Sequence, residues 1–393
     1  MKSGLLNEKL EMVKDDVIAW RRYLHQYPEL SFQEEKTSQF VYETLQSFGN
    51  LELSRPTRTS VVARLLGREP GKVLAMRADM DALPIQEENE FPFASQNPGI
   101  MHACGHDGHT AMLLGAAKIL SHWKDQIKGE IRFIFQHAEE LPPGGAQEMV
   151  KEGVMEGVDR VFGIHLMSTV PFGKIGIGYG TMTSANDTFS IRIQGKGGHS
   201  SMPNDTIDPI AIGAQVVSNL QHIASRNCDP MEKFVLSVTS FHGGDALNVI
   251  PDTVTLGGSV RSFNPKLRDH VPELMEKIIK GITEAHGASY QFDYQRGYSP
   301  VINDDKVTNL IEETILDVWG EDTLLKIPPM MGSEDFSAFA NEVPGCFIFV
   351  GAGNREKGII YPHHHPKFTV DEDSLEIGVK LFVNSAFKLL DAQ

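Results

Sequence analysis

The segment 101–110, MHACGHDGHT, concentrates side chains that bind metal ions. Within eight residues it holds one thiol, three imidazoles and one carboxylate: Cys104, His102, His106, His109 and Asp107. A thiolate together with imidazoles is the donor set that a borderline divalent ion prefers. Gly105 and Gly108 let the backbone turn tightly, so that several of these side chains can converge on one point. We therefore predict a metal site whose remaining ligands come from elsewhere in the chain.

Further candidate ligands lie far from this segment. To Cys104 and His106 we add Glu140, His165 and one of the three histidines 363–365, which residue types alone do not separate. More than four ligands on separate loops argue against a closed structural zinc site, whose ligands are usually gathered in local CxxC pairs. We predict two adjacent divalent ions, with Cys104 able to bridge them. Two such ions lower the pKa of water and polarise a carbonyl group.

The pair Glu139–Glu140 fits a division of labour between a metal ligand and a general base. One carboxylate binds metal while its neighbour takes a proton from water and passes it to a leaving amine; the residues alone do not say which does which. A rival reading makes Cys104 and His106 a nucleophile pair. The flanking glycine and the spacing of two residues favour co-ligation over that reading.

These residues follow predicted strands at one edge of a sheet. Short β-rich runs cover 60–66, 73–78, 130–135 and 160–164, and helices lie between several of them. Strands alternating with helices imply a mainly parallel sheet covered on both faces, which binds ligands beyond the carboxyl ends of its strands. The candidate groups follow these strands at that end: Asp79 and Asp81, Glu139 and Glu140, and His165, where the fourth strand is expected to stop.

Helix signals frame the same region. Apolar residues at helical spacing predict a helix over 6–26, near whose end His25 is expected to be structural. A second helix is expected from Ser31, with Glu34 completing a capping box and Gly49 ending it. The apolar stretch 107–121 predicts a buried helix with Asp107 as its N-cap.

From about residue 186 the predicted strands and helices no longer alternate one by one. Strands over 187–194, 234–242, 254–263 and 289–295 and helices over 206–225 and 265–286 give the order βαββαβ of a ferredoxin-like α+β domain. The α/β texture resumes after 300, with a helix over 307–319, a buried strand over 346–350 and a closing helix over 373–390. The fold class is therefore α/β, with domain 1–185, an inserted domain 186–297 and a second part of the first domain, 298–393.

The inserted domain carries three weaker candidates. His199 lies on a glycine-rich loop, GKGGHSSMP, and could stabilise the oxyanion formed when a carbonyl is attacked. Asn248 and Arg261 could hold a substrate carboxylate, the arginine through two parallel hydrogen bonds. Each could equally be an ordinary turn or surface residue.

Composition excludes several classes of function. The 393 residues are 41% hydrophobic and 22% charged, as in an ordinary globular protein, and the formal net charge of −16 argues against nucleic acid or an anionic membrane as partner. Three widely spaced cysteines indicate a reducing compartment without disulfides. The first 16 residues lack the apolar core of a secretory signal, and no apolar run is long enough to span a bilayer. We expect a cytoplasmic protein.

Several segments together resemble the M20 metallopeptidase family, in order and over essentially the whole chain: RADMDALP (77–84), MHACGHDGHTAMLLGAA (101–117), FQHAEE (135–140), GIHL (163–166), GKGGHSSMP (195–203), GSEDFSAF (332–339) and HHPKF (364–368). Within the family they resemble the amidohydrolase branch, which includes N-acyl-amino-acid amidohydrolases, hippurate hydrolases, indoleacetyl-amino-acid hydrolases and N-acetyldiaminopimelate deacetylases. The CGHDGH segment is specific for that branch.

The resemblance implies a zinc-peptidase-like catalytic domain in two pieces, an inserted lid or dimerisation domain, a homodimer and a binuclear site. The implied metal ligands are Cys104, His106, Glu140, His165 and His364, the last because Pro366 and Phe368 fit a His-x-Pro-x-Phe pattern. Glu139 would be the general base, and His199 would act on the oxyanion side, across the dimer. Asn248 and Arg261 would contact the carboxylate end of the substrate. Asp79 and Asp81, where sister branches have a His-x-Asp motif, are expected to orient ligands rather than bind metal.

Two departures from the family pattern stand beside the paired glutamates. His137 replaces a usual proline, and LPPGG (141–145) replaces an all-glycine run. Neither removes a ligand, although both could reshape the floor of the pocket.

The expected activity is removal of an acyl group, acetyl foremost, from an N-acyl amino acid, with N-acetyldiaminopimelate among the candidate substrates and Mn, Zn, Co or Ni as the metal. The rivals are a dipeptidase or carboxypeptidase with the same ions, a non-catalytic metal-binding protein, and a cysteine-nucleophile hydrolase.

Overall fold

The computed structural model describes residues 3–392, so Met1, Lys2 and Gln393, at the ends of two predicted ranges, lie outside the described part. The chain forms two compact units. Unit 1 comprises Met1–Met182, Val301–Pro329 and Asp335–Gln393, and unit 2 comprises Thr183–Pro300 and Met330–Glu334. Among the described helices, none combines the length and the apolar character that crossing a bilayer requires.

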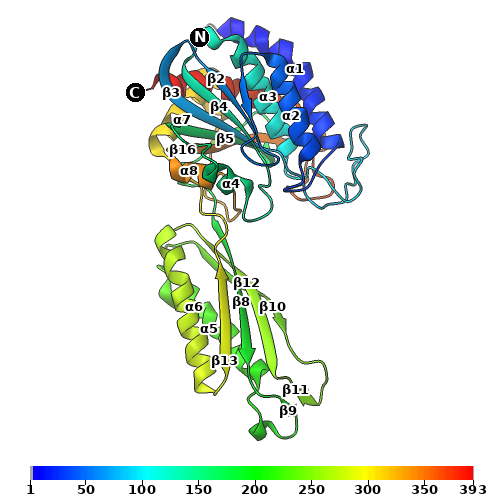
Figure 1. Ribbon diagram of the computed structural model, residues 1–393, viewed down its shortest axis with the longest axis vertical. Helices are drawn as coiled ribbons and strands as arrows, with labels where there is room; N and C mark the ends of the chain where they lie inside the picture. The colour runs from blue at the N-terminus through cyan, green and yellow to red at the C-terminus, as the bar shows by residue number, and fades with distance from the viewer. Residues whose placement is uncertain (1–2, 393) are drawn as a thin grey trace. The chain divides into compact units, whose positions relative to one another are not determined.

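Unit 1 is built on one mixed sheet of eight strands in the order β1-β2-β4-β3-β5-β16-β6-β15 (Figure 1). β4, β3, β5 and β16 form its parallel centre. β1 and β2 pair antiparallel, β2 is antiparallel to β4, and β6 is antiparallel to β16 but parallel to β15. The central strands are buried almost throughout, as expected of a sheet covered on both faces. The strands are β1 (Glu52–Ser54), β2 (Val61–Leu66), β3 (Glu69–Asp79), β4 (Lys128–Gln136), β5 (Arg160–Pro171), β6 (Ile175–Ile177), β15 (Leu324–Lys326) and β16 (Gly345–Gly353).

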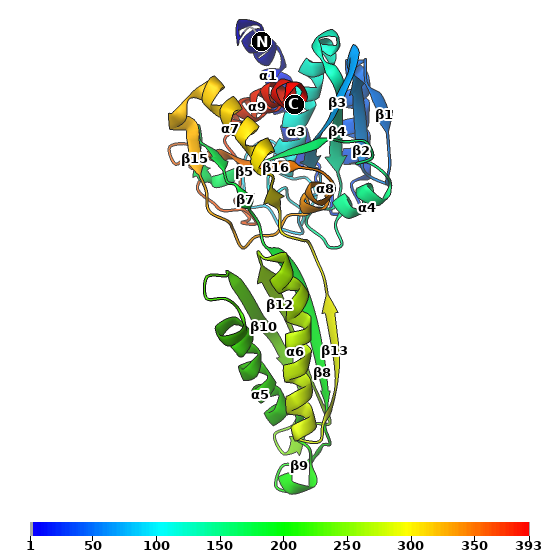
Figure 2. The same cartoon turned by 90° about the vertical axis from the view of Figure 1, so that its left-hand side faces the viewer.

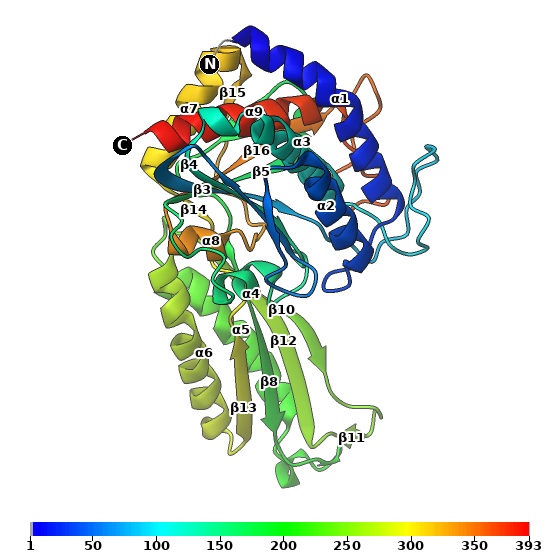
Figure 3. The same ribbon diagram turned by 45° about the horizontal axis from the view of Figure 1, so that its top comes forward.

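Helices cover both faces of this sheet. On one face α3 lies against β3 and β5, and α1, α2 and α9 pack around it (Figure 3). On the other face Phe336, which precedes α8, packs against Gly163 of β5, whereas Leu166, three residues later on the same strand, contacts α3 at Gly108. The helices of unit 1 are α1 (Ser3–Gln26), α2 (Glu35–Phe48), α3 (His106–His122), α4 (Gly145–Lys151), α7 (Asp305–Trp319), α8 (Ser337–Glu342) and α9 (Asp373–Asp391).

Unit 2 is a four-stranded antiparallel sheet in the order β10-β12-β8-β13, with α5 and α6 on one face (Figure 2). The chain order βαββαβ and this strand order are those of a ferredoxin-like domain. The elements are β8 (Ala185–Gln194), α5 (Pro209–His222), β10 (Phe234–His242), β12 (Thr253–Ser262), α6 (Pro265–Ala285) and β13 (Ser289–Gln295). A small ribbon pairs β9 (Gly198–His199) with β11 (Val249–Ile250), and in unit 1 another pairs β7 (Gly180–Thr181) with β14 (Ile302–Asn303).

Three local expectations are wrong. β5 does not stop at His165 but continues to Pro171, because the residues after the histidine keep pairing with β16. α3 begins at His106 with Gly105 as its N-cap, so Asp107 lies inside the first turn and caps nothing. The capping box of α2 does not form, because the side chains of Ser31 and Glu34 bond to other segments of the chain.

Candidate metal centre

The segment before α3 turns sharply at Gly105, whose φ of 92° is one that residues with a side chain rarely adopt. Gly108, one turn into the helix, lies so close to Leu166 that a Cβ atom would approach its side chain to 2.5 Å. The turn and the close helix–strand packing bring Cys104 and His106 against β5, next to His165.

His106 is held by its inner ring nitrogen. Nδ1 donates to the backbone carbonyl of Asp81 at 2.9 Å and lies 3.1 Å from its carboxylate. Because a carbonyl can only accept, Nδ1 carries a proton, and in the neutral ring the lone pair is on Nε2. Nε2 is buried, has no hydrogen-bond partner among the described residues, and lies 3.9 Å from Oε1 of Glu140. Asp81 thus orients His106 with its free nitrogen toward the other candidate ligands.

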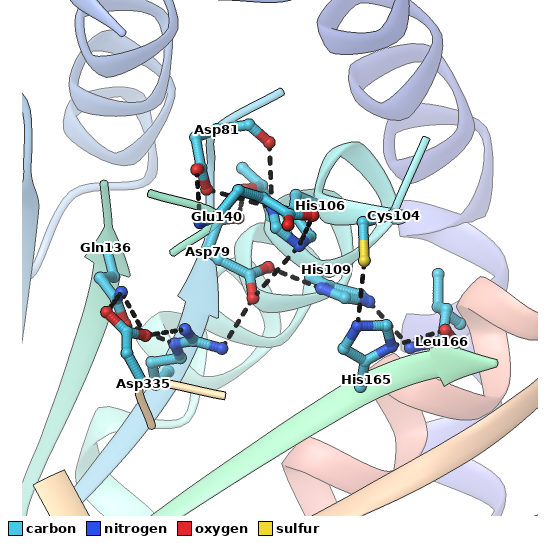
Figure 4. Close-up of polar contacts among 12 residues, drawn as sticks. Asp79, Asp81, Cys104, His106, His109, Gln136, Glu140, His165, Leu166 and Asp335 are labelled. Atoms are coloured by element: carbon cyan, nitrogen blue, oxygen red, sulfur yellow. Dashed lines mark hydrogen bonds and ion pairs between the residues drawn. The ribbon is translucent and has the colours of Figure 1, made fainter. Parts of the chain in front are cut away.

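His165 is oriented in the same way (Figure 4). Its Nδ1 donates to the carbonyl of Leu166 at 2.6 Å, which leaves Nε2 facing Sγ of Cys104 at 3.5 Å. The same carbonyl accepts a hydrogen bond from Nε2 of His363 at 2.9 Å. His363 and His165 therefore share one acceptor, and their ring centroids lie 5.3 Å apart.

Of the three histidines 363–365, only His364 belongs to a group of converging potential ligand atoms in the described part of the chain. Its Nε2 is 3.3 Å from Oε1 of Glu140. Its backbone is left-handed, with φ of 66°, and its N–H donates to the Ala103 carbonyl. The ring of His365 instead stacks on Tyr361.

The candidate ligands form two groups of three that share Cys104. One group is Cys104, His106 and His165, and the other is Cys104, Glu140 and His364; within each, one potential ligand atom per residue lies within 4.8 Å of the others. Glu139 is buried and belongs to a further group with His106 and Glu140. The five candidate ligands Cys104, His106, Glu140, His165 and His364 thus lie in one cluster, although the first and the last are 260 positions apart in the sequence.

The electrostatics of this cluster fit a cation at its centre. Although Cys104 is not fully enclosed, desolvation and then the charges of Glu140 and Glu139 hold the pKa of its thiol well above its usual value. Burial lowers the pKa of His106, but Asp79 and Asp81 outweigh it and raise this pKa to about 10. Without a metal ion this ring carries a second proton, on Nε2, and a divalent ion would take the place of that proton. Nε2 of His106 and Oε1 of Glu140 are buried without hydrogen-bond partners among the described residues, and together with a thiol they are the donor set of a borderline divalent ion.

The sequence did not single out His109 for a role, yet it orders the site. Its Nδ1 donates to Asp79 at 2.6 Å, and its Nε2 accepts the backbone N–H of Leu166 at 2.8 Å (Figure 4). The ring therefore fixes the position of β5 next to His165. Because His109 lies three residues after His106, both face the same side of α3, and the helix period was the available signal.

Asp79 is anchored from its other side by a buried arginine. Arg77 donates to Asp79 at 2.7 Å, to Gln136 at 2.7 Å and to Asp335 at 3.0 Å. Burial raises the pKa of Asp79, but Arg77 and the two histidines outweigh it and hold the pKa well below its usual value. Asp81 contacts Nδ1 of the candidate ligand His106, whereas Asp79 contacts Nδ1 of His109, which is not among the candidate ligands.

A second buried network lies behind the site. Asp107 accepts from Nε of Arg21 at 2.8 Å and bonds Nδ1 of His25 at 2.9 Å, and Nε2 of His25 bonds Glu87 at 3.0 Å. Burial lowers the pKa of His25, but Asp107 and Glu87 outweigh it, so the net shift is upward. His25 is fully buried, and its observed role is to join α1 to the start of α3.

His137, one of the two departures from the family pattern, is buried after β4. Its Nε2 lies 2.9 Å from Glu148 of α4, and its ring meets that of Phe32 edge-on. The residue after it, Ala138, has a left-handed backbone with φ of 49°.

Unit 2 carries the remaining candidates, and it separates two of them. His199 is exposed on β9, where Nδ1 accepts from Ser201, so that Nε2 carries the proton. Asn248 adjoins it, since its carbonyl accepts the N–H of Ser200. Arg261 lies near the other end of β12, roughly 25 Å along the strand from Thr253 at 3.3 Å per residue. One copy of unit 2 therefore cannot place Asn248 and Arg261 on the same carboxylate.

Comparison with known proteins places this geometry in a family. Residues 75–388 match the model of peptidase family M20/M25/M40. An N-acyl-L-amino acid amidohydrolase of Geobacillus stearothermophilus is 69% identical over 76% of this chain and 80% of its own length. Thermostable carboxypeptidase 1 of Saccharolobus solfataricus is 42% identical over 95% of both chains.

The solved structures agree with the sequence comparison. A Bacillus subtilis protein described as a dinuclear metal-binding peptidase of the M20 family is 36% identical. It superposes with a TM-score of 0.86 over 98% of this chain and all of its own. The chain belongs to peptidase family M20/M25/M40, in its amidohydrolase branch.

Proposed function

We propose that the chain is a binuclear-metal-dependent amidohydrolase that removes the acyl group, acetyl foremost, from N-acyl amino acids. The observation that carries the proposal is the pair of ligand groups that share Cys104, with Glu139 beside them. A closed structural site needs one group of four ligands and no spare carboxylate. The similarity to an N-acyl-L-amino acid amidohydrolase supports the choice of substrate.

Five residues would hold the two ions. Cys104, His106 and His165 would bind one, and Cys104, Glu140 and His364 the other. When bound, such ions lower the pKa of water and polarise the amide carbonyl. Sulfur, nitrogen and oxygen donors together suit Mn, Zn, Co or Ni.

Glu139 is the proposed general base and acid. It takes a proton from the attacking water and gives it to the nitrogen of the departing amino acid. A carboxylate oxygen of Glu139 lies within 4.8 Å of potential ligand atoms of His106 and Glu140, which supports this role.

We propose that each site uses residues of two copies of the chain. His199, with Nε2–H exposed, would donate to the oxyanion, and Asn248 would act beside it. The Arg261 that binds the substrate carboxylate would come from a different copy than the Asn248 of the same site, because β12 separates the two residues within one copy. In this proposal unit 2, predicted as 186–297, is the lid and dimerisation domain of a homodimer.

Mixing two inactive variants tests the shared site. Glu139→Gln and His199→Ala should each abolish turnover. When equal amounts of the two variants exchange subunits at random, half of the dimers contain one copy of each. In such a dimer one of the two sites has both Glu139 and His199 intact. About a quarter of wild-type activity should then return, as expected for a two-fold assembly. Recovery of no activity after exchange of subunits, demonstrated with differently tagged copies, would show that His199 does not act across a dimer.

A substrate and metal panel tests the activity itself. Metal-loaded wild type should turn over N-acetyl-amino acids, including N-acetyldiaminopimelate, with a higher kcat/KM than free dipeptides. The reverse order would favour the carboxypeptidase reading, which the Saccharolobus solfataricus relative makes the second candidate. Activity that survives exhaustive chelation would indicate a Cys104 nucleophile, and inert protein with every metal would indicate a non-catalytic binder.

The three cysteines are free thiols in the structure. We propose a cytoplasmic location on that ground, since a reducing compartment keeps thiols free.

A further inference from the structure

Glu34 is a fully buried carboxylate with no role in capping the helix that it precedes. Its Oε1 accepts the backbone N–H of Ala138 at 2.8 Å and that of Phe32 at 3.0 Å, and its Oε2 accepts the hydroxyl of Thr59 at 2.9 Å. A carboxylate is costly to bury, and here it joins three segments far apart in the sequence. One of these segments carries the proposed base.

Both backbone amides on Oε1 belong to left-handed residues. Phe32 has φ of 64° and Ala138 has φ of 49°, values that residues other than glycine rarely adopt. The carbonyl of Ala138 is also held, by the N–H of Gly145 at 3.0 Å. The strained backbone at Ala138 is thus fixed from both sides, and Glu34 supplies one of the two contacts.

The two glutamates that follow Ala138 serve one site although they are adjacent in the sequence. In an extended strand, successive side chains point to opposite faces. Glu139 and Glu140 nevertheless bring carboxylate oxygens within 4.8 Å of each other and of a ring nitrogen of His106. The chain bends at residues 139 and 140, and the left-handed Ala138 sets the direction in which it enters that bend.

The amides on either side of Glu139 are therefore held by two buried carboxylates. Glu34 accepts from Ala138, and Asp81 accepts from the N–H of Glu140 at 3.0 Å. Ser31, in the same turn as Glu34, donates to the same oxygen of Asp81 at 2.7 Å. The turn before α2 thus fixes the loop that carries the proposed base.

We propose that Glu34 is a positioning residue for the hydrolysis, which acts by holding Ala138 so that Glu139 and Glu140 face the same site. The inference rests on the proposed function, because it assigns Glu34 a part in placing the base. Glu34 touches neither substrate nor the reacting atoms in this scheme. Its loss should therefore lower kcat and leave KM nearly unchanged.

The main experiment compares Glu34→Ala with wild type at saturating divalent ion. A misplacement of about 1 Å costs on the order of 100-fold in rate, so we expect kcat to fall by roughly 10- to 100-fold. KM should stay within about 3-fold. Metal content is measured at the same saturating concentration of ion, so that kcat is compared between equally loaded proteins. A kcat within about 2-fold of wild type would overturn the proposal.

Two matched variants separate positioning from general stability. Glu34→Gln keeps an oxygen for the two amides and can turn its NH2 to the Thr59 hydroxyl, so kcat should stay within about 3-fold of wild type. Thr59→Val removes a buried hydrogen bond to the same carboxylate but leaves the Ala138 contact, and kcat should again be nearly unchanged. If Thr59→Val lowers kcat as far as Glu34→Ala does, the effect is one of stability and the proposal is wrong.

A shorter side chain covers the case in which Glu34→Ala does not fold. Glu34→Asp keeps the charge and withdraws the carboxylate from Ala138 by one methylene, and the same loss of kcat is expected. Unchanged kcat in a folded Glu34→Asp would contradict the role.

A crystal structure of the alanine variant gives a readout that does not depend on activity. Ala138 should leave the left-handed region and the Glu139–Glu140 backbone should shift; an unmoved loop would overturn the proposal. If wild type turns over no N-acyl amino acid, the proposed function fails, and this structural test still decides whether Glu34 holds the loop.

Discussion

Glu34→Gln replaces a buried carboxylate by a neutral amide of the same shape, and it should make the protein more stable at high pH. Burial and then the negative charge of Asp81 raise the pKa of Glu34 from 4.5 to about 7, although its three hydrogen bonds oppose the shift. In the unfolded chain the carboxyl loses its proton near its ordinary pKa. The folded state therefore binds this proton more tightly, and the stability so gained is present below pH 4.5 and is lost as pH rises to 7.

The size of the effect follows from that difference. The folded and unfolded pKa values differ by about 2.5, which at 1.36 kcal/mol per pKa unit corresponds to about 3 kcal/mol of stability. Wild type loses this stability above pH 7, whereas the amide variant has no proton to lose there and keeps it. About 2 kcal/mol of the difference should build up between pH 5.5 and pH 8.5. A protonated carboxyl and an amide offer Ala138 and Thr59 similar hydrogen bonds, so the two proteins should approach equal stability in acid.

Urea unfolding at several pH values, in one metal state, measures this difference. The matched control is Glu35→Gln at the neighbouring exposed position, where the free energy of unfolding should change by less than about 0.5 kcal/mol at every pH. A difference between Glu34→Gln and wild type that does not grow with pH would refute the reasoning. A stabilised variant that keeps its kcat would show that shape rather than charge positions the loop.

Three further predictions concern the metal centre. Cys104→Ala should lower the affinity for both ions, whereas His364→Ala should affect one, because only the cysteine belongs to both ligand groups; metal stoichiometry by mass spectrometry separates these outcomes, and equal losses would refute the bridging role. Asp79→Asn should weaken metal binding by about 10- to 100-fold in a chelator competition, since Asp79 holds His109, whose ring lies beside those of His106 and His165. Unaltered affinity would contradict that role. Arg77→Met should destabilise unit 1 by about 3–5 kcal/mol in urea, because Asp79 and Asp335 lose a buried charged partner; a change below 1 kcal/mol would show that the network is dispensable.

The sheet was predictable because its signals are local. Buried parallel strands are apolar runs, and the run that became β4 ends directly before the two glutamates. β3 likewise ends at Asp79. The position of His165 inside β5 was not predictable, because its continued pairing with β16 depends on residues almost two hundred positions away.

Local patterns misled where a distant partner competed. Ser31 and Glu34 have the spacing of a capping box, but Asp81 and Ala138 offer these side chains other hydrogen bonds. Asp107 is a good N-cap residue by type, yet Arg21 draws it into a buried ion pair. In each case the side-chain oxygen bonds a distant segment of the chain and does not cap the N-terminus of the helix.

The separation of Asn248 from Arg261 was contained in the sequence. A strand predicted over 254–263 already places one residue before its start and the other near its end, and 3.3 Å per residue gives the distance. The resemblance assigned both to one substrate, and strand geometry shows that one copy of unit 2 does not bring them together.

The 260 positions between Cys104 and His364 also determine when the site can form during synthesis. The thiol leaves the ribosome long before the last histidine, and β16, at the centre of the sheet, is also made late. Most of unit 2 is one uninterrupted stretch, Thr183–Pro300, and it can fold while the rest of unit 1 is still being translated. The ligand group that includes His364 can therefore be completed only near the end of synthesis, whereas the residues of the other group are all made by position 165.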